Sequence, residues 1–115
     1  MVMKESDLKI RAKQYALAII LLFSELPKRT DIQIIGRQLL RSGTSRAKSN
    51  ADFISKNEGT LQELEESQYW LELLAESGLF PEERLASVKK ETGELKGIFV
   101  SIVRNTKAKS QNPKQ

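Results

Sequence analysis

The chain has 115 residues and a net charge of +4, and it contains no cysteine and no histidine. This length fits a single domain with one core. The missing residue types exclude disulfides, thiolate nucleophiles, imidazole bases and the common zinc sites, so we expect no enzyme, no metal and no cofactor. The apolar run 16–23 is far shorter than the ~20 residues of a membrane span, and the first residues lack a signal-peptide core. We therefore expect a soluble, cytoplasmic protein.

The charge is divided into three blocks along the chain. Residues 1–57 carry a net charge of +6, residues 58–86 carry −7, and residues 87–115 carry +5. An acidic segment between two basic ones suits pairing between helices, within or between subunits, or a basic surface that meets a polyanion.

A first helix is expected up to the Leu26-Pro27 pair, because a residue before proline disfavours the helical conformation. Apolar residues recur at steps of three and four: Leu8, Ala12, Tyr15, Ile19, Leu22, Phe23 and Leu26. A second apolar set lies off that stripe: Ile10, Leu17, Ile20 and Leu21. A helix that is apolar on two faces is either central or covered by a partner. We therefore predict that Leu17, Ile20 and Leu21 contribute to a contact between subunits.

The second helix is expected to start after Thr30, a predicted N-cap, and to become less apolar after Leu40. It leads into QLLRSGTSRAKS, residues 38–49, where small residues give way to basic ones. Backbone amides hold phosphate at a helix N-terminus, but this segment lies near a helix C-terminus. We therefore interpret Ser42 and Gly43 as residues that allow close packing against the first or the fourth helix.

The third helix is predicted from a cap at Ser49, with Asp52 as the acidic arm of a capping box, to Gly78 as the C′ residue. We interpret the adjacent Tyr69 and Trp70 as core and interface residues rather than a platform for bases. The acidic residues are expected on a solvated or subunit-facing surface, because di-iron sites in bundles also require histidine. They are Glu63, Glu65, Glu66, Glu72 and Glu76.

The fourth helix is predicted to begin at Pro81, followed by two acidic residues at the positive end of the helix dipole. A heptad-spaced seam follows: Leu85, Val88, Thr92, Leu95, Phe99 and Ile102. Gly93 and Gly97 lie one turn apart and each costs ~1 kcal/mol relative to alanine, so a close helix contact is expected there. The tail 107–115 is expected to be disordered. The fold class is therefore all-α: an up-down four-helix bundle formed by residues 1–106.

A set of motifs now suggests a family. LP after the first helix, QLLRSGTS, KSNADFISK and LQELEESQYWLELLAESG together resemble a bacterial four-helix-bundle family. That family includes proteins encoded in intervening sequences of large-subunit ribosomal RNA genes, and it is similar to the accessory variability proteins of diversity-generating retroelements. The resemblance covers the chain from about Lys13 to about Ile102. It implies a non-enzymatic cytoplasmic bundle that forms a ring-like homopentamer, and for the retroelement members a basic exterior that binds nucleic acid and a reverse transcriptase.

The chain differs from this family after RSGTS. Relatives continue with a segment like VGANYREA before the basic turn, whereas here Ser45 is followed directly by Arg46-Ala47-Lys48-Ser49. About nine residues are missing, which corresponds to ~13 Å of helix. We therefore predict a shortened second helix that ends near residues 45–48.

Two classes of function remain open. The first is a nucleic-acid-associated accessory or scaffold protein that contacts phosphate through basic helix faces, with RNA or DNA as partner. Its candidate residues are Lys9, Lys13, Arg37, Arg41, Lys48, Lys89, Lys90, Lys96 and Arg104. The second is a structural oligomerisation or protein-interaction bundle without nucleic-acid binding, in which the acidic third helix pairs with basic helices of a neighbour.

Overall fold

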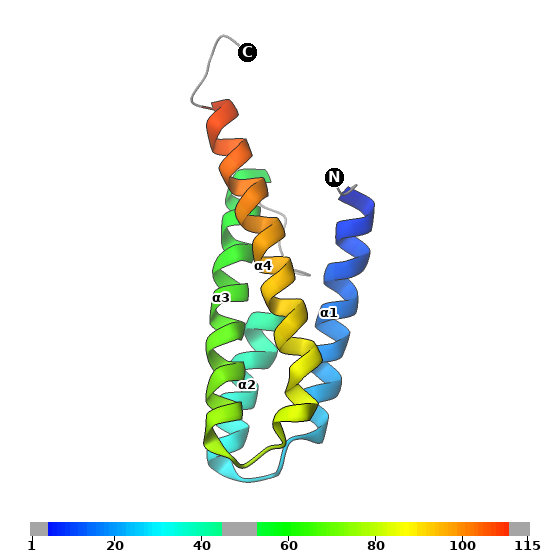
Figure 1. Cartoon of the computed structure of the whole chain (residues 1–115), viewed down its shortest axis with the longest axis vertical. Helices are drawn as coiled ribbons and strands as arrows, with labels where there is room; N and C mark the ends of the chain where they lie inside the picture. Colours follow the sequence, from blue (N-terminus) through cyan, green and yellow to red (C-terminus); the bar gives the residue numbers. More distant parts are fainter. Residues whose placement is uncertain (1–4, 45–52, 111–115) are drawn as a thin grey trace.

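The structure, a computed structural model, describes residues 5–44 and 53–110. It contains four helices in chain order: α1 Glu5–Glu25, α2 Thr30–Thr44, α3 Phe53–Ser77 and α4 Glu82–Ser110. Consecutive helices run antiparallel, and the α1–α2 and α3–α4 connections lie at the same end of the molecule (Figure 1). Each helix packs on the next, and α4 also packs on α1, so α1 and α3 stand at opposite corners. The predicted up-down four-helix bundle is confirmed.

The second helix is the shortest of the four, as predicted. It has 15 residues, against 21 in α1, 25 in α3 and 29 in α4. At 1.5 Å per residue, α2 is about 22 Å long and α3 about 37 Å. Beyond Thr44, the described part of the bundle therefore consists of α1, α3 and α4 (Figure 1). The expected end of the helix at residues 45–48 and the expected cap at Ser49 and Asp52 lie outside the described residues.

The core is formed by the predicted helical stripes. On α4, the seam residues from Leu85 to Phe99 are buried, and Ile102 packs against them at the edge of the core. The largest fully buried side chains come from all four helices: Ile19, Ile32, Leu39, Leu71, Leu74, Leu85, Leu95 and Phe99. Heptad spacing therefore identifies the face of α4 that joins the other helices.

The helix ends agree with the sequence in most places. Gly78 follows α3 with a φ of 69°, the left-handed conformation that favours glycine at C′. Pro81 precedes α4, and its carbonyl oxygen accepts a hydrogen bond from the Arg84 amide at 3.1 Å. The N-cap prediction at Thr30 was wrong by one residue, because the Gln33 amide already donates to the carbonyl of Arg29 at 2.9 Å.

Two expectations about α4 were also wrong. A Cβ atom added at Gly93 or Gly97 would meet open space, so neither glycine marks a close helix contact in the described chain. The helix also continues to Ser110, so residues 107–110 of the expected tail are helical, and Lys107 pairs with Glu58 of α3 at 3.1 Å. No helix in residues 5–44 or 53–110 is both long enough and apolar enough to cross a membrane.

Candidate interaction surfaces

A layer of hydroxyl groups crosses the core, with one contribution from each helix. Tyr15 of α1 and Thr92 of α4 lie 2.7 Å apart, and Ser42 of α2 and Ser67 of α3 also lie 2.7 Å apart. Thr92 donates its proton to the carbonyl of Val88 at 2.7 Å, so Tyr15 is the donor to Thr92. Burial raises the pKa of Tyr15, although its hydrogen bond to Thr92 opposes that shift. The periodic pattern included Tyr15 and Thr92 as core positions but did not reveal that their hydroxyl groups pair.

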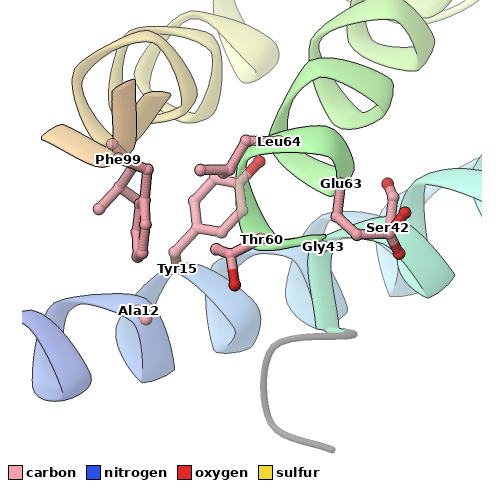
Figure 2. Close-up of a pocket in the computed structure, with 9 residues that line it drawn as sticks. Ala12, Tyr15, Ser42, Gly43, Thr60, Glu63, Leu64 and Phe99 are labelled. Atoms are coloured by element: carbon pink, nitrogen blue, oxygen red, sulfur yellow. The ribbon is translucent and has the colours of Figure 1, made fainter. Parts of the chain in front are cut away.

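A small cavity lies beside this layer, where α2 ends. Figure 2 shows the ring of Tyr15 between α3 and Phe99 of α4, with Thr60 and Leu64 beside it. The cavity has a volume of about 20 Å³, which is room for one water molecule. Pockets for small molecules usually measure ~300–1,000 Å³. This cavity therefore suits a structural water rather than a substrate.

The RSGTS segment packs largely as predicted. Gly43 faces Ile19 of α1 so closely that an added Cβ would lie 2.8 Å from an Ile19 carbon. The hydroxyl of Ser42 lies 2.7 Å from that of Ser67 of α3, a contact that the sequence did not predict. The small residues therefore bring α2 close to α1 on one side and place a hydroxyl contact with α3 on the other.

Ion pairs join neighbouring helices across the bundle. Arg11 of α1 binds both carboxylate oxygens of Glu91 at 2.6 and 2.7 Å and also binds Glu94 at 2.7 Å. These hydrogen bonds, the one to Glu91 above all, raise the pKa of Arg11. Arg41 of α2 binds Glu63 at 2.9 Å and Glu66 at 2.6 Å on α3. Part of the charge segregation in the sequence is therefore neutralised within one chain.

The predicted nucleic-acid residues divide into two groups. Arg41, Lys89 and Lys96 are engaged within the protein: Arg41 as above, Lys89 with Glu82 at 3.7 Å and Lys96 with Gln68 at 3.2 Å. Five others are exposed: Lys9, Lys13, Arg37, Lys90 and Arg104. Lys48 lies outside the described residues. The exposed group comes from three helices, and its two members on α4 are about 21 Å apart along the helix. The structure therefore does not gather the predicted set onto one helix face.

The outward side of α1 carries large apolar side chains in water. We call Ile10, Leu17, Ile20 and Leu21 the apolar face of α1; they are 57%, 50%, 44% and 65% exposed. The stripe that includes Ile19 points the other way and is buried. The prediction that this helix is apolar on more than one face is confirmed, and Ile10 joins the three predicted interface residues on the same surface.

The two aromatic residues of α3 behave differently. Trp70 is half-buried and packs against the core, while its indole nitrogen is buried without an acceptor among the described residues. Tyr69 is 55% exposed and meets Trp70 edge-on, with ring centroids 5.0 Å apart. The placement of Tyr69 in the core was therefore wrong, because position 69 lies on the outer face of the helix. Among the residues that the structure describes, no three acidic side chains are arranged to hold a metal ion.

Comparison with known proteins identifies a related solved structure. No family model and no curated protein matches the chain. A solved structure from Bacteroides thetaiotaomicron VPI-5482, a protein with unknown function from the S23 ribosomal protein family, is similar with a TM-score of 0.73 and 30% sequence identity. The match covers 84% of this chain and 97% of the other. Because this similarity in sequence and fold extends over nearly the whole of that protein, the chain belongs to the S23 ribosomal protein family.

Proposed function

We propose that this chain is a non-enzymatic protein-interaction bundle that associates with further copies of itself through the apolar face of α1. The supporting observation is the exposure of four large aliphatic side chains on a helix whose opposite stripe is already in the core. Single exposed apolar residues are common on protein surfaces, but clusters mark interaction sites. The resemblance to ring-forming bundles supports the same role.

The energy available from this face is moderate. Full burial of a leucine or isoleucine contributes ~1.5–3 kcal/mol, and about half of each side chain in the face is still in water, so complete burial would contribute ~3–6 kcal/mol. Association costs an estimated ~4–15 kcal/mol in lost freedom of motion. The face therefore needs a partner surface that is itself apolar and of complementary charge.

Light scattering coupled to size-exclusion chromatography tests the proposal. At ~20 μM, a concentration that reveals a Kd of ~10 μM or tighter, the chain should have a mass above that of one copy. Leu17→Gln combined with Leu21→Gln should shift the mass to 13.0 kDa without loss of helicity, because both side chains are exposed. Leu79→Gln is the matched control, since Leu79 is an exposed leucine outside this face. A wild-type chain that stays at one copy would contradict the proposal.

Nucleic-acid binding is the second candidate, and a specific observation favours it. Lys13 and Arg37 are exposed on neighbouring helices and make no ion pair with the residues that the structure describes. The similar protein belongs to a family named for a ribosomal protein, which is consistent with such a partner. Arg41 is a weaker candidate than the sequence suggested, because two glutamates already occupy its guanidinium.

A salt-dependent titration tests this second role. If Lys13 and Arg37 contact phosphate, the affinity for labelled RNA or DNA should fall as salt rises, by ~0.9 in log K per neutralised phosphate on duplex DNA. Lys13→Gln with Arg37→Gln should reduce that slope equally for all sequences, and Arg41→Gln should leave it nearly unchanged. Binding weaker than ~100 μM at low salt, the weak limit of ordinary non-specific binding, would exclude the nucleic-acid role.

A further inference from the structure

A second surface of the bundle combines an exposed aromatic ring with carboxylates. We call Glu65, Tyr69, Glu72 and Glu76 the acidic face of α3; all four residues are exposed. Their spacing of four, three and four places them along one side of the helix. The glutamates of α3 nearer to the neighbouring helices form ion pairs. Glu63 and Glu66 bind Arg41, and Glu58 binds Lys107. The three glutamates of the acidic face make no ion pair within the described part of the chain.

The acidic face also has an apolar border. Trp70 and Leu73 are half-buried beside it on α3, and Ile34 of α2 is 55% exposed. The Ser42–Ser67 contact sets the antiparallel register of α2 and α3. About two turns from that contact, toward the start of α2 and the end of α3, Ile34 therefore lies opposite residues 73–77. The surface around Tyr69 can therefore bury apolar side chains as well as attract cations.

The apolar face of α1 has the complementary properties. It contains aliphatic side chains, and Lys13 lies exposed between Ile10 and Leu17. The face extends over 12 residues from Ile10 to Leu21, and the acidic face extends over 12 residues from Glu65 to Glu76. Each is about 17 Å long. The two surfaces thus have the same length, both contain apolar side chains, and Lys13 is opposite in charge to the three glutamates.

The two faces cannot meet within one molecule. Because α1 and α3 occupy opposite corners of the bundle, their outward sides point in opposite directions (Figure 1). A contact that joins α1 of one copy to α1 of another would bring lysines of like charge together, which opposes association. A contact between unlike faces instead places Lys13 beside carboxylates of opposite charge.

We infer that the acidic face of α3 is the docking site for the apolar face of α1 of a second copy. The contact is heterologous, so every copy offers one donor face and one acceptor face, and assembly continues until a ring closes or a filament forms. Lys13 of one copy lies among the acidic-face carboxylates of the next, and Tyr69 packs against Leu17 and Leu21. This inference rests on the proposed self-association and adds the surface that receives α1.

Two complementary variants test it. The first, Leu17→Glu with Leu21→Glu, disables the α1 face and leaves the α3 face intact. The second, Tyr69→Lys with Glu72→Lys, disables the α3 face and leaves the α1 face intact. All four side chains are exposed, so circular dichroism should show both variants to be folded. Each variant alone should be a single copy in light scattering, and an equimolar mixture should form a 1:1 heterodimer that grows no further.

The outcomes distinguish a failure of the α3 docking site from a failure of self-association. If the second variant still assembles like the wild type while the first does not, α1 pairs with something other than the α3 face, and the inference is overturned while self-association stands. Two monomeric variants that do not combine on mixing also overturn it. A wild-type chain that is itself a single copy overturns both. A heterodimer that is at least tenfold tighter than the self-association of either variant supports the inference.

Discussion

The same glycine-to-alanine change should have opposite effects at two positions of this bundle. At Gly43, the new Cβ would lie 2.8 and 2.9 Å from two carbons of Ile19, which is fully buried on α1. Carbon atoms pack best at ~3.5–4.0 Å, so α1 and α2 must move apart or Ile19 must leave its rotamer. At Gly97 of α4, the new methyl group would meet nothing within 4 Å.

The expected magnitudes follow from these distances. Overpacking in a core costs ~1–3 kcal/mol, and the gain in helix propensity at Gly43 is small because it is the last residue but one of α2. We expect Gly43→Ala to destabilise the protein by ~1–2 kcal/mol. Gly97→Ala lies in the interior of a long helix and should stabilise it by ~0.5–1 kcal/mol. The two variants should therefore differ by ~1.5–3 kcal/mol although their chemistry is identical.

Urea denaturation followed by circular dichroism measures both values. The protein concentration must be the same throughout, because any association of the folded state would add to the measured stability. Ile19→Ala removes the two carbons nearest to the new methyl group and leaves only the Ile19 Cβ at 3.2 Å, so Gly43→Ala should cost much less in that background. If Gly43→Ala is as stable as the wild type, or costs as much with Ile19→Ala as without it, the close contact between α1 and α2 does not exist.

Three further predictions concern single side chains. In urea denaturation, Trp70→Ala should cost ~3 kcal/mol, the low end for a large aromatic residue, because Trp70 is only half-buried. Trp70→Phe should cost under ~1.5 kcal/mol, because the indole nitrogen has no hydrogen bond to lose. Equal costs for the two variants would contradict this. Burial raises the pKa of Tyr15 above 10.0, so the unfolded chain ionises first and the free energy of unfolding should fall as the pH rises through about 10. Tyr15→Phe should lack this alkaline loss of stability, and an unchanged pH profile in the variant would refute the role of Tyr15. The pKa of Glu66 is raised, mainly by a hydrogen bond with Glu63. The contribution of Glu66 to stability should therefore be complete below pH ~4.5 and should decrease as the pH rises through its folded-state pKa. Glu66→Gln should remove this pH dependence, and an identical slope of stability against pH in the variant would contradict the prediction.

Patterns within single helices were the most predictable features of this chain. The step of three and four residues located the buried stripe of α1 and the seam of α4, because a helix turns 3.6 residues per turn in any surroundings. The end of α3 at Gly78 was equally accessible, since few other residues adopt a positive φ without strain. The apolar face of α1 was also visible as an apolar set off the main stripe.

Relations between helices were not predictable in the same way. Gly43 and Gly97 look alike in sequence, yet one touches Ile19 and the other faces open space. Arg37 and Arg41 lie one turn apart, yet two glutamates of α3 bind Arg41 alone. In each pair, the difference depends on which neighbouring helix lies on that side. Side-chain spacing shows which face of a helix enters the core, but not which residues of a neighbouring helix it meets.

The sequence by itself therefore determined the helices, their core stripes, the short second helix and the absence of histidine and cysteine chemistry, because local periodicity and composition decide these features. Only the tertiary structure decided which charges are neutralised, that Tyr69 is exposed, and that the apolar and acidic faces lie on opposite sides of the bundle. These features depend on contacts between residues far apart in the chain, and such contacts exist only after the four helices have packed.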